Sequence, residues 1–145
     1  MSALRPVTLI TGASAGIGLA LAREFAKNGH ELFLTARRED RLANLADEIA
    51  SEGGTRPHVF AADLSDPGAV EKIREAVAVK GLDVEYVVNN AGFGVLGRAA
   101  VRERHLQLQM IDVNARALTD LSLAFLDSLQ RQKGGILNVA SVASF

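Results

Sequence analysis

The chain has 145 residues, of which 48% are hydrophobic and 23% charged, a length that can bury the core of one soluble domain. Its 16 basic and 17 acidic residues give a net charge of -1, so it lacks the basic surface typical of proteins that bind nucleic acid or anionic membranes. The absence of cysteine excludes disulfides and thiol nucleophiles, and three scattered histidines lack metal-ligand spacing, so no metal is expected.

The apolar stretch near the start, residues 7–22, lacks the pattern of a targeting or membrane-spanning segment. Thr11, Ser14 and three glycines interrupt it, and the charged pair Arg23-Glu24 ends it. A signal peptide needs basic residues followed by an unbroken apolar region, and a spanning helix needs about 20 apolar residues. We therefore expect a soluble, cytoplasmic protein.

Apolar runs of strand length alternate with helical patterns along the chain. The predicted strands are residues 7–10, 31–36, 57–64, 84–90 and 136–140. The predicted helices are residues 17–28, 39–52, a segment behind Asp66-Pro67, and 103–132 with a break near its start. Asp66 is expected to cap the third helix, with Pro67 as its first residue. This alternation predicts a doubly wound, Rossmann-type α/β fold, with a parallel sheet and helices on both faces.

The segment TGASAGIG, residues 11–18, lies where the first predicted strand meets the first predicted helix. A helix N-terminus has free N–H groups and the positive end of the helix dipole, so this position suits a phosphate. Gly12 would permit a tight turn, Gly16 would let the backbone approach a pyrophosphate, and Gly18 would let the helix pack closely on the strand. We also expect Ile17 to contact the cofactor. The alternative is a glycine turn without a ligand, and the flanking strand and helix favour nucleotide binding.

With its leading threonine, TGASAGIG resembles the fingerprint of the classical branch of the short-chain dehydrogenase/reductase family. Further motifs follow in the family's order, namely DL at 63–64, NNAG at 89–92, DVNARA at 112–117 and GGILNVASVAS at 134–144. The resemblance implies a Rossmann-type domain over residues 1–145, a nicotinamide cofactor, and hydride transfer to or from a small-molecule carbonyl or alcohol. It also implies a homodimer or homotetramer formed through the long helix.

The end of the second predicted strand indicates which nicotinamide cofactor is used. Ala36 stands where NAD-preferring members of the family carry an acidic residue, and Arg37 follows, as in NADP-preferring members. A guanidinium can hold a 2′-phosphate through two hydrogen bonds, and the Ser14 hydroxyl could bind the same phosphate. Alternatively, Arg37 and Arg38 form a solvated helix start, although cations are unfavourable at a helix N-terminus. We therefore expect NADP(H), bound by Arg37 and Arg38.

Asp63 and Leu64 follow the third predicted strand. By the resemblance, Asp63 accepts a hydrogen bond from the exocyclic amine of adenine, with the Leu64 backbone beside it. Asp63 could instead be an ordinary turn or capping residue. Since Asp66 fills the capping role, we expect Asp63 to serve the cofactor.

The NNAG motif ends the fourth predicted strand. Gly92 would permit close approach to the ribose and nicotinamide, with Ala91 beside it. An asparagine at this position can also tie neighbouring backbone segments together. Of Asn89 and Asn90, we expect Asn90 on the cofactor side.

Asn114 lies in the long predicted helix, three residues after Ile111 and four before Leu118, within an apolar stripe that continues to Leu121 and Phe125. A buried amide without partners costs about 1–3 kcal/mol, so this position calls for an explanation. Asn114 could simply bend the helix by bonding to its backbone. By the resemblance it is the active-site asparagine that holds a water for a proton relay, and we favour that role.

Ser141 follows the fifth predicted strand. By the resemblance it is the active-site serine, whose hydroxyl binds the substrate carbonyl and stabilises developing negative charge on its oxygen. Ser144 is a weaker candidate because it lies three residues too late for the pattern.

The family's proton donor is the tyrosine of a Tyr-x-x-x-Lys motif beyond the serine, and these 145 residues contain no such motif. Tyr86, the only tyrosine, lies in the fourth predicted strand and is interpreted as a core residue. The sequence ends at Phe145, ahead of the motif's position, with the fifth strand as an apolar sheet edge. We expect that these 145 residues are a truncated part of a longer NADP(H)-dependent oxidoreductase that contains the motif. The alternative is a short, non-catalytic NADP-binding sensor or scaffold protein.

Overall fold

The computed structural model describes residues 3–142. All strand pairs in its single five-stranded sheet are parallel, and the strand order is β3-β2-β1-β4-β5. The strands are β1 (Arg5–Thr11), β2 (Leu32–Ala36), β3 (His58–Ala61), β4 (Leu82–Asn89) and β5 (Gly135–Asn138). The sequence order reverses at β1, where the chain crosses from the β2 side to the β4 side. The predicted doubly wound α/β fold is therefore confirmed.

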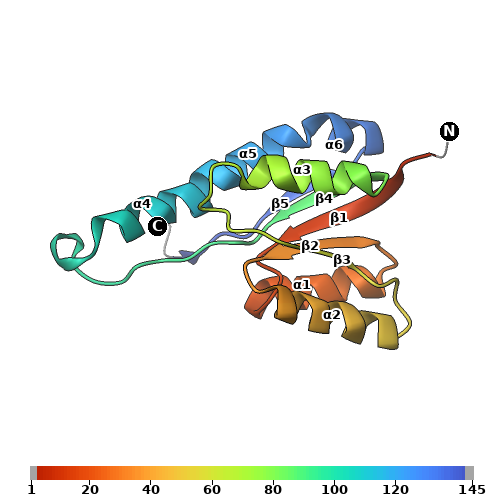
Figure 1. The fold of residues 1–145 in the computed structure, drawn as a ribbon, viewed down its shortest axis with the longest axis horizontal. Coiled ribbons are helices and arrows are strands. Elements are labelled where there is room, and N and C mark those ends of the chain that lie inside the picture. Colours follow the sequence, from red (N-terminus) through yellow and green to blue (C-terminus); the bar gives the residue numbers. More distant parts are fainter. Residues whose placement is uncertain (1–2, 143–145) are drawn as a thin grey trace.

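Helices cover both faces of the sheet (Figure 1). One face carries α1 (Gly16–Lys27) and α2 (Glu39–Ser51). The other carries α3 (Ala69–Val79) and a long helical segment that ends at Gln132. That segment consists of α4 (Arg104–Ile111), the π-helical turn η2 (Asp112–Ala117), α5 (Leu118–Ala124) and α6 (Leu126–Gln132), and the short 3-10 turn η1 (Ala99–Val101) precedes it.

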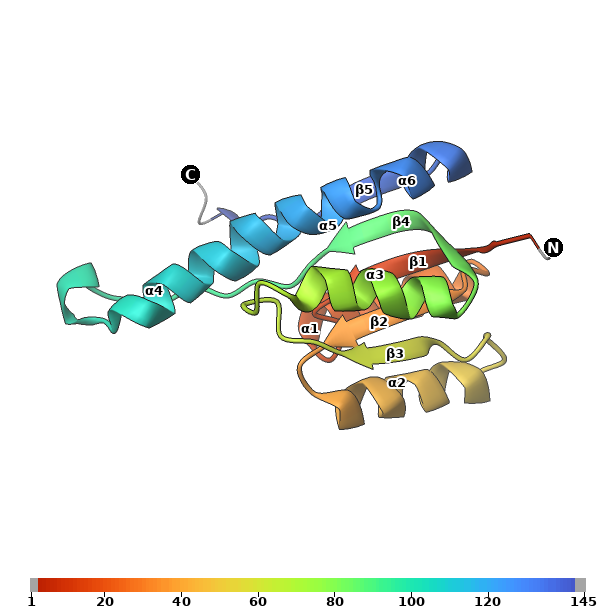
Figure 2. The ribbon, with the colours of Figure 1, turned by 45° about the horizontal axis from the view of Figure 1, so that its top comes forward.

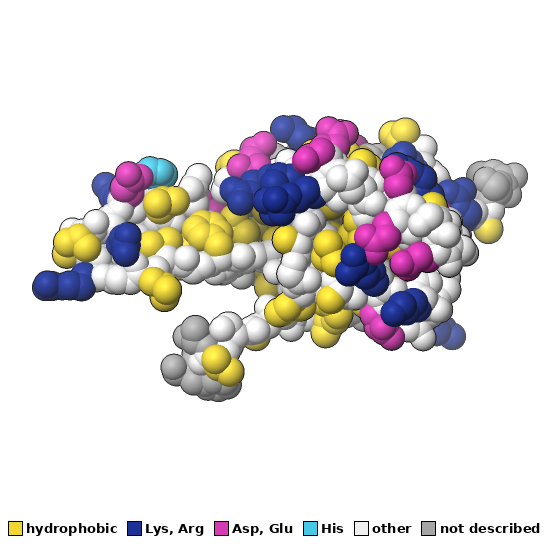
Figure 3. Space-filling model, turned by 90° about the horizontal axis from the view of Figure 1, so that it is seen from below, with side chains coloured by type: hydrophobic (Ala, Val, Ile, Leu, Met, Phe, Trp, Pro, Cys, Tyr) yellow, Lys and Arg dark blue, Asp and Glu magenta, His cyan; other side chains and the backbone are white. Residues whose placement is uncertain are grey.

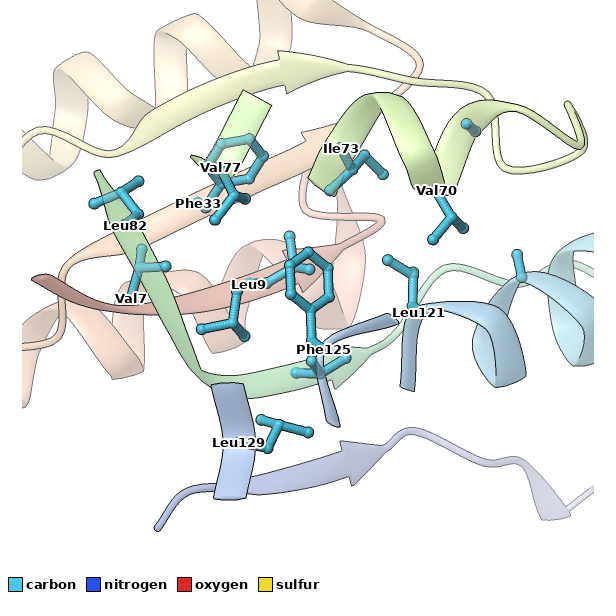
Figure 4. Packing of buried hydrophobic residues seen from close by; sticks show 14 of the residues in the cluster. Val7, Leu9, Phe33, Val70, Ile73, Val77, Leu82, Leu121, Phe125 and Leu129 are labelled. Atoms are coloured by element: carbon cyan, nitrogen blue, oxygen red, sulfur yellow. The ribbon is translucent and has the colours of Figure 1, made fainter. Parts of the chain in front are cut away.

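Side chains that alternate along the central strands build one core on each face of the sheet. On β1, Leu9 packs toward α3 and α5, whereas Ile10 packs toward α1 and α2. Phe33 on β2 is fully buried beside Leu9 in the first of these cores, as Figure 4 shows. Strands covered on both faces need apolar residues at successive positions, which explains the continuous apolar runs in the sequence.

The third helix begins later than predicted. It starts at Ala69 with Gly68 as its N-cap residue, and Pro67 lies before it. Asp66 Oδ1 accepts a hydrogen bond of 2.9 Å from the Gly68 backbone N–H. Asp66 therefore shapes the turn ahead of α3 instead of capping the helix, because aspartate also bonds to the backbone two residues on in such turns.

The long helical segment is irregular in its middle, whereas the sequence predicted a break near its start. Its interruptions are the π-helical turn η2 and Phe125, which separates α5 from α6 with φ -107° and ψ 9°. Its buried stripe consists of Ala117, Leu121, Phe125 and Leu129. Ile111, predicted to lie in that stripe, is 58% exposed.

The boundaries of the sheet expose apolar residues. β5 is an edge strand, as predicted, and its Ile136 and Leu137 are each 43% exposed. Tyr86, on the inner strand β4, is only partly buried and packs against the rings of Phe25 and His30, so its assignment to the core was wrong. Within the part of the chain that the structure describes, no helix is long and apolar enough to cross a bilayer, and no three acidic or histidine side chains form a cation site.

Candidate functional site

A cleft of about 380 Å³ opens where the carboxyl ends of β1 to β4 meet the α4 side of the molecule. In Figure 2 the four strands point toward this end, and α4 extends beyond them. Carboxyl ends at the switch in strand order are where open α/β sheets bind ligands. Eight residues that the sequence assigned to a cofactor line the cleft, namely Gly12, Ser14, Arg37, Arg38, Asp63, Leu64, Ala91 and Gly92.

The structure explains why glycine is needed at positions 12, 16 and 18 of the first turn. Gly12 and Gly16 have φ of +62° and +56°, values that other residues rarely adopt. A Cβ on Gly12 would lie 2.9 Å from the Ala91 Cα, whereas a Cβ on Gly16 would meet nothing within 4 Å. A Cβ on Gly18 would overlap the Gly12 carbonyl oxygen and the Asn90 amide nitrogen. The turn therefore needs glycine for conformation at two positions and for close packing at Gly18.

The Thr11 hydroxyl joins the ends of β1 and β4. Thr11 Oγ1 accepts hydrogen bonds from the backbone N–H groups of Asn90 (3.0 Å) and Ala91 (2.9 Å), and donates to the Val88 carbonyl (3.4 Å). Sequence reasoning did not assign Thr11 a role, although a threonine directly before the glycine of the turn was the available signal. Its side chain fixes the loop after β4 against the glycine turn.

Asn90 reinforces the same junction. Its Nδ2 donates to the carbonyls of Thr11 (3.1 Å) and Gly12 (3.2 Å), and Asn90 is not among the residues that line the cleft. Gly16, Ile17 and Gly18 also lie outside the lining. The Asn90 amide thus ties backbone segments together, the role that the sequence analysis gave to the other asparagine of NNAG.

Arg37 and Arg38 stand at the mouth of the cleft, between the end of β2 and the start of α2. Both side chains are exposed, and within residues 3–142 neither guanidinium forms a salt bridge or a hydrogen bond. No acidic residue occupies the end of β2, where Ala36 lines the cleft. Two positive charges are therefore available to an anion here.

Asp63 holds a turn after β3, the strand that pairs with β2. Its Oδ1 accepts hydrogen bonds from the Ser65 hydroxyl (2.7 Å) and the Ser65 backbone N–H (3.0 Å). These two bonds are the main reason that the pKa of Asp63 is lowered, and the positive charge of Arg37 adds to the effect. Because Asp63 and Asp66 both hold turns, the argument that Asp66 leaves Asp63 without a structural role was wrong. Both bonds fall on Oδ1, so Oδ2 can accept from a ligand.

Thr35 is a lining residue that sequence reasoning missed. It is 1% exposed, and its buried hydroxyl has no hydrogen-bond partner within the described residues. A buried polar atom without a partner is uncommon in folded proteins and often marks a place where a ligand or a water completes the bonding. Threonine is frequent in strands, so the sequence held no signal for this role.

Asn114 lies in η2 and contacts the loop after β4. Its Oδ1 accepts from the Phe93 N–H (3.0 Å), and its Nδ2 donates to the Phe93 carbonyl (2.8 Å). The residue is exposed, so the expectation that its amide is buried in an apolar stripe was wrong. A π-helical turn often marks a functional position, and here it presents Asn114 to Phe93, next to Gly92.

Ser141 follows β5 and is exposed. Neither Ser141 nor Asn114 belongs to the lining of the cleft, so the structure does not place the two predicted catalytic residues in the same cavity as the cofactor residues. The weaker candidate Ser144 lies outside the described residues.

A parallel sheet whose glycine turn and reversal of strand order meet at one cleft defines a doubly wound protein of the Rossmann type. The chain belongs to the short chain dehydrogenase family, whose sequence model matches residues 6–145. It is 38% identical over 138 residues to serine 3-dehydrogenase of Agrobacterium fabrum, covering 94% of this chain and 53% of that protein. It is 33% identical over 140 residues to the NADP-dependent 3-hydroxy acid dehydrogenase YdfG of Salmonella typhi, with 94% and 54% covered.

Solved structures show the same fold. An alcohol dehydrogenase from Thermococcus sibiricus complexed with 5-hydroxy-NADP matches with TM-score 0.86 and 39% identity, over 92% of this chain and 57% of that one. L-sorbose reductase from Gluconobacter frateurii, complexed with NADPH and L-sorbose, matches with TM-score 0.89 and 30% identity, over 99% and 55%. The chain thus spans little more than half the length of these relatives.

Proposed function

We propose that the cleft binds NADP(H), and that the protein is an NADP(H)-dependent oxidoreductase acting on a small-molecule carbonyl or alcohol. The observation that supports this most directly is the pair Arg37 and Arg38, which have no salt-bridge partner at the cleft mouth in the described chain. Their guanidinium groups match a 2′-phosphate, and no acidic residue at the end of β2 competes for the ribose hydroxyls.

Further features of the cleft fit this cofactor. A Cβ on Gly16 would meet only open space, so the turn leaves room beside the N-terminus of α1 for a pyrophosphate. The comparisons add support, because several similar structures are complexes with NADPH, NADP or 5-hydroxy-NADP.

When bound, the nicotinamide supplies or accepts the hydride, and the residues of the chain position the reactants. Ser141 holds the substrate carbonyl oxygen through its hydroxyl and stabilises the charge that develops there. Asn114 holds a water of the proton relay, and its two bonds to Phe93 fix its orientation. No Tyr-x-x-x-Lys motif occurs in these 145 residues, and we propose that a complete reductase takes this acid from sequence outside them.

The long helix bears exposed apolar residues that suit self-association. Leu108, Ile111, Leu123 and Leu126 are 42–65% exposed along α4 to α6. Figure 3 shows hydrophobic side chains on the projecting part of the molecule that contains α4. We propose that the protein forms a homodimer or homotetramer through this face and works in the cytoplasm.

The test is a fluorescence titration of the purified protein with NADPH and with NADH. We expect NADPH to bind at least about tenfold more tightly, because each charge-assisted contact to the 2′-phosphate adds affinity. Arg37→Glu should reverse or abolish the preference, and Arg41→Glu, an equal charge change on exposed α2 surface, should leave it. Equal affinity for both cofactors, or none for either, contradicts the proposal.

The second function is a non-catalytic NADP-binding sensor or scaffold, favoured by the finding that neither Ser141 nor Asn114 lines the cleft that holds the cofactor residues. An oxidoreductase oxidises NADPH when it reduces its substrate, whereas a sensor or scaffold does not. A panel of aldehydes and ketones assayed with NADPH separates them, because a sensor binds the cofactor without oxidising it.

A further inference from the structure

One wall of the cleft belongs to residues that the sequence analysis did not single out. Leu106, Gln109 and Val113 line it from α4 and the start of η2. Their i, i+3, i+7 spacing places them on one face of the helix. Leu64, from the turn after β3, lines the same cleft and shares a hydrophobic cluster with Val113.

This part of the cleft is apolar enough to take a flat ring. Leu64 is 8% exposed and Val113 is partly buried, and the ends of β2 and β3 contribute Ala36 and Ala62 to the apolar lining. Binding pockets for aromatic groups combine such apolar surfaces with a few polar groups that fix orientation. The Asp63 carboxylate and the Gln109 amide are among the polar groups that line the same cleft.

Among the described residues that line the cleft, Gln109 alone has an amide side chain. It is half-buried and forms no side-chain hydrogen bond with any residue from 3 to 142. An amide offers a donor and an acceptor side by side, whereas an ionised carboxylate such as Asp63 only accepts. Glutamine can therefore contact adenine at two atoms, accepting from the N6 amine while donating to the ring nitrogen beside it.

We propose that Gln109 recognises the adenine edge of the dinucleotide and selects it against other bases. Its Oε1 accepts one hydrogen of the N6 amine and its Nε2 donates to the ring nitrogen, while Asp63 Oδ2 accepts the second amine hydrogen. This inference rests on the proposed NADP(H) function and adds the residue that reads the base.

Hypoxanthine tests this geometry, because it carries a carbonyl oxygen where adenine carries the amine. With the glutamine on the N7 side, the O6 and N7 acceptors of hypoxanthine both face it, so one of its two hydrogen bonds is lost. Asp63 Oδ2 then faces the O6 carbonyl oxygen and loses the hydrogen that the amine supplied. The probes are NADPH and its deaminated analogue, reduced nicotinamide hypoxanthine dinucleotide phosphate, and the readout is direct binding measured by calorimetry.

We expect the unaltered protein to bind NADPH at least about tenfold more tightly than the hypoxanthine analogue. Gln109→Leu should lower that ratio about fivefold, and Gln109→Asn, which keeps the amide but shortens its reach, should lower it similarly. Gln130→Leu on exposed α6 surface is the matched control and should leave the ratio unchanged.

A ratio unchanged within twofold in both Gln109 variants overturns the inference, as does an unaltered protein that binds both dinucleotides equally. Either result leaves NADP(H) binding itself intact. A protein that binds neither dinucleotide contradicts the proposed function, and this inference with it.

Discussion

Arg131 on α6 binds Asp83 on β4 through two parallel hydrogen bonds of 2.7 and 3.1 Å. Asp83 is 3% exposed and also accepts a bond of 2.7 Å from Gln132. The Arg131 guanidinium is the main cause that lowers the pKa of Asp83 to about 2, from an ordinary value of 3.8. This contact joins the end of the long helical segment to the start of a central strand.

The lowered pKa predicts how stability depends on pH. Asp83 has a lower pKa folded than unfolded, so its ionisation stabilises the protein fully above pH 4, and this contribution is lost as the pH falls from about 4 to 2. The loss is at most roughly 2 kcal/mol, because solvent weakens an ion pair whose arginine is half exposed. Urea unfolding at several pH values measures it.

Asp83→Asn removes the titrating group and should flatten this part of the stability profile. Asp47→Asn is the control, because Asp47 pairs with Arg56 while 68% exposed and should change the profile little. An Asp83→Asn profile as steep as the original would show that Asp83 is not the group responsible.

Thr11→Val keeps the shape of the side chain and removes its hydroxyl. The partly buried N–H groups of Asn90 and Ala91 lose their acceptor, so we expect the free energy of unfolding to fall by about 1–3 kcal/mol. Thr55→Val, at an exposed position, controls for the hydroxyl itself and should have little effect. An equal decrease in the free energy of unfolding in the two variants would contradict the role assigned to Thr11.

The two glycines beside α1 should respond differently to alanine. Gly16→Ala imposes a left-handed conformation on alanine without any clash, a cost of about 1–2 kcal/mol. Gly18→Ala drives a methyl group into the Gly12 carbonyl and the Asn90 amide, which requires backbone movement and costs more. Urea unfolding of the two variants ranks them, and a smaller loss for Gly18→Ala contradicts the close packing.

Asn114 should control the order of the loop at Phe93. In Asn114→Leu the Phe93 N–H loses its acceptor, so its hydrogen exchange should accelerate by about tenfold or more, in line with the loss of a hydrogen bond of 1–2 kcal/mol. Asn114→Asp keeps the acceptor and should retain most of the protection. Asn44→Leu on exposed α2 surface is the control. Unchanged exchange at Phe93 in the leucine variant would disprove the contact.

Local patterns predicted the fold and the glycine turn, because each depends on residues close in sequence. Alternating apolar runs place the strands, and Gly12 and Gly18 occur where a strand must turn tightly into a helix. Eight of the expected cofactor residues reached the cleft for the same reason, since parallel strands bring their carboxyl ends together.

Features that depend on distant partners or irregular backbone could not be predicted. The Arg131–Asp83 pair joins residues 48 positions apart, and nothing near either residue indicates the other. The π-helical turn η2 widens the helix, so a stripe counted at regular helical spacing assigned Ile111 and Asn114 to the wrong side. The position of Gln109 in the cleft lining depends on which face of α4 meets the cleft, and this follows only from tertiary packing.

The bonds of Thr11 and Asn90, together with the close packing of Gly18, join the glycine turn, the first turn of α1 and the end of β4. None of these three segments can shift without breaking bonds to the other two. The backbone N–H groups that face a ligand are therefore ordered when the chain folds, before any ligand arrives. A dinucleotide would lose little affinity to ordering this side of its site, so the entropy cost of binding falls mainly on the flexible side chains of Arg37, Arg38 and Gln109.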